Sequence, residues 1–166
     1  MIDRNLIRKG EIIVKNMGLC KNSMAKEKHI FEEILKWPDF DGFTDLKEPE
    51  LSYLQEEETN YRIRIKNNKD EIIFIMEFGG PDDFSLGIEL VRINTLKKMY
   101  RQKGLAKFYI NELVKLCKRN SIPRISIFIG TSRENHPGSD PGGMTKEQLK
   151  IFYKSFEDEG IEIIAS

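Results

Sequence analysis

The sequence has few cysteines and no long apolar run. Cys20 and Cys117 are too few for a disulfide framework or a metal cluster, so we expect two reduced thiols and no metal site. The longest apolar run, Ile72 to Met76, is far shorter than the roughly 20 residues that span a membrane. The charged N-terminus has no apolar segment behind it. We therefore expect a cytoplasmic protein that makes no membrane contact.

A net charge is also missing, since 27 basic residues balance 27 acidic ones. This balance argues against a nucleic-acid partner held by bulk positive charge. The composition is 39% hydrophobic and 10% aromatic, which is enough for a folded core and excludes a disordered chain. A length of 166 residues suits one domain, so we expect residues 1–166 to form a single domain.

The charges are nevertheless separated along the chain. Between Val91 and Arg124 a single acid, Glu112, stands against ten basic residues: Arg92, Lys97, Lys98, Arg101, Lys103, Lys107, Lys115, Lys118, Arg119 and Arg124. Between Glu32 and Glu58 ten acids stand against Lys36 and Lys47. Such a chain could hold an anionic ligand on one side and a cationic ligand on the other. The alternative is that both segments are solvated surfaces.

The spacing of apolar residues predicts alternating strands and helices. Strands are expected over 11–15, 61–66, 72–78, 86–96, 124–129 and 161–164, with 60–79 as a hairpin. Helices are expected from Ser23 to about Trp37, from Gly104 to Arg119 and, with Thr145 as cap, to about Phe156. The stretch 39–58 is expected to be a loop with one short helix, and 130–144 a long loop.

The most informative place is the junction between the strand over 86–96 and the helix from Gly104. A helix start leaves backbone N–H groups unpaired and favours an anion. Gly104 would let a phosphate approach the main chain, Ala106 keeps the next turn close, and Arg101 and Lys103 add positive charge. The sequence fits neither a P-loop nor a dinucleotide fingerprint. Taken alone, the junction could also be an ordinary basic helix start.

The stretch from Leu86 to Phe156 resembles the GNAT N-acetyltransferase superfamily. Arg101, Gly104 and Ala106 match its acetyl-CoA signature Q/R-x-x-G-x-G/A, and 149–156 is similar to its A-x-x-F-Y-x-x-F segment. The resemblance implies an α/β (α+β) domain with a GNAT-like central sheet, mixed and mostly antiparallel, splayed at the cofactor strand and flanked by helices. It also implies acetyl transfer from acetyl-CoA to a primary amine of a small molecule or peptide.

The same resemblance implies roles for individual residues. Backbone groups of Leu96 and Asn94 would pair with the pantetheine arm of acetyl-CoA. The pyrophosphate would be held at Arg101, Gln102, Lys103, Gly104, Leu105 and Ala106. Tyr153 would protonate the departing CoA thiolate, which suits a phenol because it is protonated at neutral pH. The alternative for Tyr153 is a core aromatic residue.

The general base stays open at this stage. The position that the resemblance assigns to it is Leu90, which cannot accept a proton. Glu89 is adjacent but would face the other way unless a bulge shifts the register. Glu77 and His136 are alternatives, whereas His29 is expected to be structural. The acidic segment favours a cationic amine as acceptor, and a homodimer is left open.

The sequence also departs from the family pattern. Lys146 replaces a frequent Asn, Leu149 replaces an Ala, and a single strand follows the last helix. These departures leave open a non-catalytic acyl-CoA-binding or sensor module. A third hypothesis is nucleic-acid binding by the basic segment, against which the neutral net charge argues.

Overall fold

The computed structural model describes residues 21–53, 61–80, 84–129, 144–158 and 160–166. The strand predicted over 11–15, and all but residue 144 of the long loop predicted over 130–144, lie outside this part. The chain divides into two compact units, Met1–Trp37 and Pro38–Ser166. Of the helices that the structure describes, none is long and apolar enough to cross a membrane.

The first unit contains the helix α1, Lys21–Ile34. The sequence predicts this helix, although its first residue lies two positions before Ser23. Glu33 lies 3.6 Å from the Nε2 atom of His29, one turn away on the same helix. The His29 side chain is 57% exposed, and its structural role stays a prediction.

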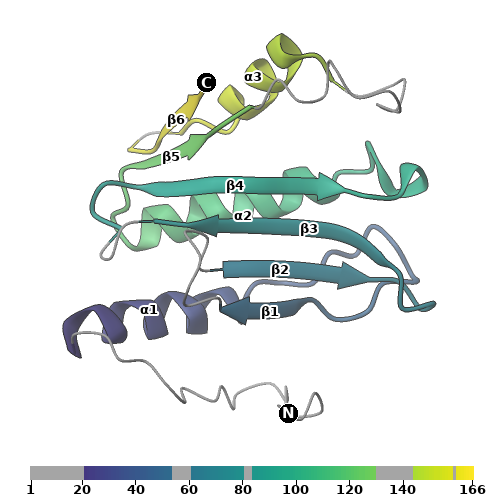
Figure 1. Cartoon of the computed structure of the whole chain (residues 1–166), viewed down its shortest axis with the longest axis horizontal. Helices are drawn as coiled ribbons and strands as arrows, with labels where there is room; N and C mark the ends of the chain where they lie inside the picture. Colours follow the sequence, from purple (N-terminus) through teal and green to yellow (C-terminus); the bar gives the residue numbers. More distant parts are fainter. Residues whose placement is uncertain (1–20, 54–60, 81–83, 130–143, 159) are drawn as a thin grey trace. The chain divides into compact units, whose positions relative to one another are not determined.

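The second unit is built on a six-stranded mixed sheet with the order β1-β2-β3-β4-β5-β6 (Figure 1). Its strands are β1 Glu50–Tyr53, β2 Tyr61–Lys66, β3 Ile72–Gly79, β4 Ile88–Thr95, β5 Arg124–Ile127 and β6 Glu162–Ala165. The pairs from β1 to β4 are antiparallel, and the pairs β4–β5 and β5–β6 are parallel. The predicted mixed, mostly antiparallel sheet is confirmed.

The short helix expected within 39–58 is a wrong prediction for the residues of this stretch that the structure describes. Residues 50–53 form the strand β1, which follows Pro49 and pairs with β2. The carboxylate of Glu50 accepts a hydrogen bond from Lys66 at 2.7 Å and lies 3.5 Å from Arg64. These cross-strand ion pairs stabilise an extended edge that has no strong pattern of its own.

The core of the sheet lies where β2 and β3 pair. Tyr61, Ile63 and Ile65 alternate with polar residues along β2 and are buried. Their partners on β3 are Phe78, Met76 and Phe74. Phe74 stacks on Tyr109 of helix α2, Leu105–Arg119, with ring centroids 5.0 Å apart. The apolar face of α2 therefore packs on this face of the sheet.

Helices connect both parallel strand pairs, as such connections require. Helix α2 connects β4 to β5, and α3, Lys146–Lys154, connects β5 to β6 and packs against β6. Thr145 caps α3 as predicted: its hydroxyl accepts from the N–H of Gln148, and the Gln148 side chain accepts from the N–H of Thr145. This capping box fixes where α3 begins.

Candidate functional site

Strands β4 and β5 separate partway along their length. They pair at Ile88–Ile125, Glu89–Ser126 and Leu90–Ile127, after which β4 continues to Thr95 paired with β3 only. Figure 1 shows the two strands diverging from this point. Within the described ranges, the edge of β4 from Val91 to Thr95 has no strand beside it. A sheet that opens here has backbone groups that can receive an extended ligand.

A β-bulge lies at the point of separation. On β3, Phe78 pairs with Leu90 whereas Glu77 pairs with Arg92, so Val91 is an extra residue on β4. A bulge bends its strand and increases the local twist. The side chain of Val91 is 46% exposed, and that of Phe128, which follows β5, is 73% exposed. Two exposed apolar side chains thus follow the last paired residues of the two strands.

The register decides which backbone groups of β4 face the open edge. The N–H of Leu96 donates to the carbonyl of Ile73 at 2.7 Å, so it faces β3. Successive residues of a strand turn their backbone groups to opposite edges. Asn94 therefore also faces β3, and the groups at the open edge belong to Ile93 and Thr95. The expected pantetheine contacts at Leu96 and Asn94 have to be shifted by one residue.

The turn before α2 has an unusual backbone. Gln102 has φ 57° and Gly104, the N-cap of α2, has φ 89°. Left-handed residues in a tight turn direct successive N–H groups toward one side. A Cβ atom at Gly104 would have no neighbour within 4 Å, so the space in front of this residue is open to a ligand.

The N–H groups of this turn are available. From Gln102 to Lys107, no backbone N–H has an acceptor among the described residues, and the first backbone bond of the helix runs from Phe108 to the Gly104 carbonyl at 2.9 Å. The positive end of the helix dipole lies at the same place. The Gln102–Lys107 turn can therefore bind an anion of the size of a phosphate.

The basic residues around the turn differ in where their side chains lie. Arg101 folds back, donating from Nε to the carbonyl of Thr95 at 2.9 Å and from Nη2 to that of Leu96 at 3.5 Å. It therefore holds the turn against the end of β4. Lys98, Lys103 and Lys107 are exposed and have no ion-pair partner in the described part of the chain. These three lysines add positive charge at the turn to that of Arg101.

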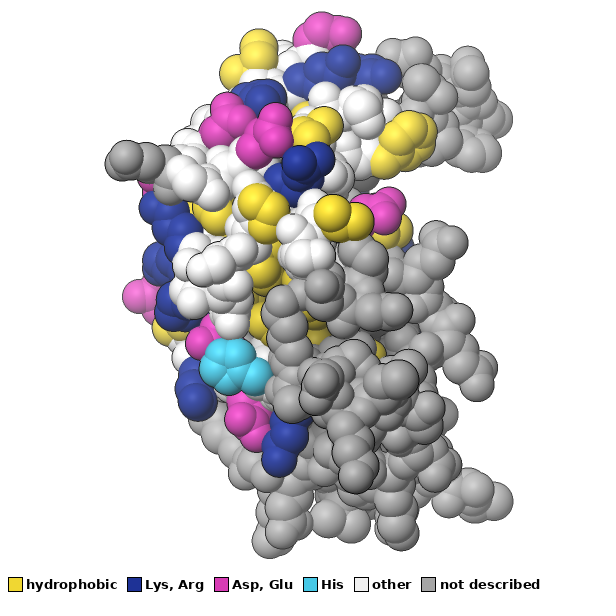
Figure 2. Space-filling view, turned by 90° about the vertical axis from the view of Figure 1, so that its left-hand side faces the viewer, with side chains coloured by type: hydrophobic (Ala, Val, Ile, Leu, Met, Phe, Trp, Pro, Cys, Tyr) yellow, Lys and Arg dark blue, Asp and Glu magenta, His cyan; other side chains and the backbone are white. Residues whose placement is uncertain are grey.

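The rest of the basic segment is largely neutralised. Lys97 pairs with Glu71, Lys115 with Glu112, Lys118 with Asp158, and Arg124 with Glu162. On the face shown in Figure 2, Asp and Glu side chains occur among the Lys and Arg side chains. Four of the ten basic residues of this segment therefore have an acidic partner, and nucleic-acid binding by the segment stays a prediction.

Tyr153 lies on α3 and is 7% exposed. Its ring lies 5.3 Å from that of Phe152, which contacts Phe156 at 5.0 Å between ring centroids. This setting also suits a core aromatic residue. Its role as a proton donor stays a prediction.

The candidate bases differ in their surroundings. Glu77 is 9% exposed and accepts a hydrogen bond from Nε of Arg62 at 2.6 Å. Glu89 is exposed, opposite Gly79 on β3 and Ser126 on β5. The bulge at Val91 follows Glu89, so Glu89 stays on the face opposite to Leu90. His136 lies outside the described residues.

The acidic segment is partly occupied by structural contacts. Glu50 is paired with β2, and Asp45 accepts the hydroxyl of Tyr100. Glu56, Glu57 and Glu58 lie outside the described residues. A cationic acceptor stays a prediction. Sequence reasoning missed the contact of Asp45 with Tyr100, because no local pattern connects residues so far apart.

Two further expectations concern thiols and metals. Cys117 is buried, and burial raises the pKa of its thiol to about 12, which suits a core residue and not a nucleophile. Cys20 lies outside the described part. Among the described side chains, no group of three or more His, Cys, Asp or Glu could hold a metal ion.

Compared with known protein families, with curated proteins and with solved structures, the chain has no match. The candidate site is defined by three features of the chain itself. These are the open edge of β4, the free N–H groups of the Gln102–Lys107 turn, and the lysines at 98, 103 and 107.

Proposed function

We propose that the chain is an acetyl-CoA-dependent N-acetyltransferase that acts on a primary amine of a small molecule or peptide. One observation carries the proposal. Strand β4 separates from β5 after Leu90, and the chain then leads into α2 through a turn whose N–H groups have no acceptor among the described residues. An extended amide-containing arm and a pyrophosphate need these two features side by side. The resemblance of Arg101, Gly104 and Ala106 to the GNAT signature falls on the same turn.

The chain's own groups fit the cosubstrate. The N–H groups from Gln102 to Ala106 would donate to the pyrophosphate oxygens, with Lys103 and Lys107 adding charge. The backbone groups of Ile93 and Thr95 would pair with the amides of the pantetheine arm. The Thr95 carbonyl already accepts a hydrogen bond from Arg101. Three backbone groups therefore remain for the pantetheine arm: the N–H of Thr95, and the N–H and the carbonyl of Ile93.

The proposed reaction needs a base and an acid. The acceptor nitrogen forms a bond to the acetyl carbon while the bond from that carbon to sulfur breaks. The nitrogen loses a proton to a general base, for which Glu89 stays our candidate, acting through water because the bulge leaves it on the face of β4 opposite to Leu90. The sulfur leaves as a thiolate and takes a proton from the hydroxyl of Tyr153. The proposed products are an N-acetylated amine and CoA.

The second candidate function is an acyl-CoA-binding module without turnover. Tyr153 is 7% exposed beside Phe152, which is the setting of a packing residue. If Tyr153 only packs, the site keeps its anion-binding turn and lacks the expected acid. Release of a free thiol in the presence of acetyl-CoA and a panel of primary amines separates the two functions.

Gly104 and Gly160 provide a matched test of binding. Both have left-handed backbones, with φ 89° and 86°, and a Cβ at either position would have no neighbour within 4 Å. Substitution by Glu therefore costs both sites a similar backbone strain of roughly 1–2 kcal/mol. Only Gly104→Glu places a carboxylate at the anion-binding turn.

Calorimetry with acetyl-CoA then gives the answer. We expect Gly104→Glu to weaken binding by about a hundredfold or more and Gly160→Glu to leave it unchanged. Circular dichroism of both variants checks that the fold is kept. Equal affinity in the two variants would remove the turn from the binding site and with it the proposed function.

A further inference from the structure

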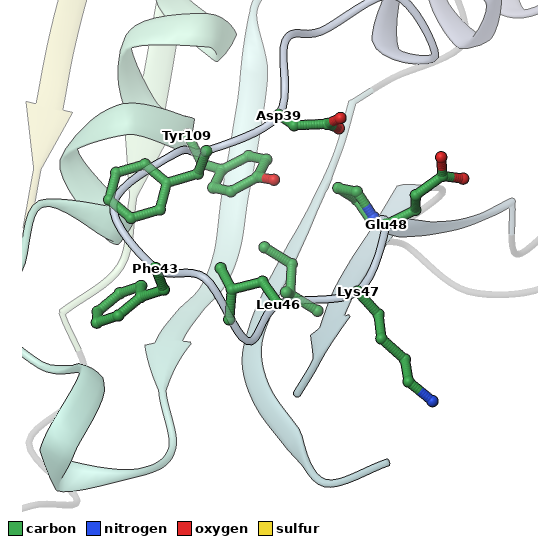
Figure 3. A pocket seen from close by; sticks show the side chains of 9 residues that line it. Asp39, Phe43, Leu46, Lys47, Glu48 and Tyr109 are labelled. Atoms are coloured by element: carbon green, nitrogen blue, oxygen red, sulfur yellow. The ribbon is translucent and has the colours of Figure 1, made fainter. Parts of the chain in front are cut away.

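A cavity of about 120 Å³ lies in the second unit between the loop over 39–49, strand β2 and helix α2. Its walls include Phe40, Phe43, Leu46, Ile65 and Tyr109, and Asp39 stands at its border (Figure 3). Pockets for drug-sized ligands measure roughly 300–1,000 Å³. This cavity therefore has room for a small molecule only.

The aromatic wall is held in place by its neighbours. The ring of Phe40 lies between those of Phe43 and Phe108, with centroid distances of 5.8 and 5.4 Å. It also lies against Gly42, where a Cβ atom would come within 2.3 Å of the ring. Because Gly42 has no side chain, the Phe40 ring can pack directly against the loop backbone. The wall is therefore a packed aromatic cluster.

The charge at the border of the cavity is negative. Asp39 has no ion-pair partner among the residues that the structure describes, and its carboxylate lies on the same side of the cavity as the Tyr109 hydroxyl (Figure 3). Burial raises the pKa of Tyr109, and the negative charge of Asp39 adds to this effect. Glu48 is a second carboxylate at the border.

The lysine that borders the cavity does not pair with Asp39. Lys47 borders the cavity, but its ammonium group donates to the carboxylate of Asp70 and extends away from the cavity (Figure 3). The border of the cavity at Asp39 therefore has an exposed carboxylate beside the ring of Tyr109, without an ion-pair partner among the described residues. Aromatic faces attract cations, and the attraction increases when water is excluded.

We propose that this cavity binds a small organic ammonium ion, with its alkyl part against Phe40, Phe43 and Leu46 and its charged nitrogen at Asp39. A neutral molecule of the same shape would gain the apolar contacts alone, and an anion would be repelled. The cavity does not include the Gln102–Lys107 turn, so ammonium binding here is tested separately from acetyl-CoA binding.

The test is a titration of the full chain with n-butylammonium chloride, followed through backbone amide chemical shifts. We expect saturable shifts for the loop over 39–49 and for Tyr109. The neutral probe 1-butanol should bind about tenfold or more weakly, and butyrate should not bind. Sodium chloride holds the ionic strength constant throughout, because screening alone can change exposed carboxylates.

Asp39→Asn and Asp41→Asn form a matched pair of variants. Both remove one negative charge from an exposed position of the same loop, but Asp41 does not border the cavity. We expect about a tenfold or larger loss of n-butylammonium affinity in Asp39→Asn and none in Asp41→Asn. The proposal is overturned if the shifts do not saturate, if 1-butanol binds equally well, or if the two variants lose the same affinity.

Discussion

The hydroxyl of Tyr100 donates a hydrogen bond to the carboxylate of Asp45, which lies 55 residues earlier in the chain. Tyr100 ends the 3-10 turn η1, Lys98–Tyr100, just before the candidate site, and Asp45 belongs to the loop that borders the cavity. The ring of Tyr100 also contacts Phe43 edge-on at 4.9 Å between centroids. One tyrosine therefore connects the anion-binding turn with the cavity loop.

This contact predicts a dependence of stability on alkaline pH. The hydrogen bond to Asp45 raises the pKa of the Tyr100 phenol above its ordinary value. A group whose pKa is raised by folding stabilises the protein below its unfolded pKa, here about 10, and loses this contribution as the pH rises through the folded value. Tyr100→Phe should remove that part of the pH dependence.

Urea unfolding between about pH 8 and about pH 11 measures the effect. The free energy of unfolding should fall more steeply with pH in the unmodified chain than in Tyr100→Phe. Tyr109 also titrates late, but it is present in both proteins and cancels in the comparison. If the free energy of unfolding falls equally steeply with pH in both proteins, the contact with Asp45 does not raise the pKa of Tyr100.

Much of the sheet could be predicted because its strands carry their own patterns. The alternation from Tyr61 to Lys66 predicts a half-buried strand, and Thr145 predicts the start of α3. Strand β1 could not be predicted in this way. Its four residues are stabilised by Arg64 and Lys66 on the neighbouring strand, and such pairing is invisible to a local pattern.

In the candidate site, too, one part could be predicted from local sequence and another part depends on the pairing of strands. Gly104 and the basic residues around it indicate the anion-binding turn, and the structure gives this turn free N–H groups. The edge of β4 depends instead on the bulge at Val91 and on the bond of Leu96 to Ile73. A one-residue change of register reverses which groups face outward, and spacing alone does not reveal it.

The proton donor can be tested at Tyr153. Tyr153→Phe keeps the packing beside Phe152 and removes the hydroxyl alone. If Tyr153 protonates the thiolate, kcat should fall by roughly 10²–10⁴ while the affinity for acetyl-CoA changes little. Thiol release and calorimetry measure the two quantities. Unchanged turnover would assign Tyr153 to the core and leave another group or water as the donor.

The general base can be tested by comparing Glu89 with Glu77. Glu89 is exposed, so Glu89→Gln should leave stability unchanged and lower kcat by roughly 10²–10⁴ if it accepts the proton. Glu77 is bonded to Arg62, so Glu77→Gln should lower the free energy of unfolding by about 1–3 kcal/mol. A large loss of kcat in Glu77→Gln with normal turnover in Glu89→Gln would reverse the assignment.

The thiol of Cys117 should be inert in the folded chain. It is fully buried, and burial raises its pKa to about 12, so little thiolate forms near neutral pH. In a Cys20→Ser background, labelling by a thiol reagent should be slow without denaturant and rise in parallel with unfolding in urea. Fast labelling of the folded protein at neutral pH would show that Cys117 is accessible and not part of the core.

The raised pKa of Cys117 also predicts a pH dependence of stability. The contribution of this thiol to the free energy of unfolding is present below about pH 8.5 and is lost as the pH rises toward 12.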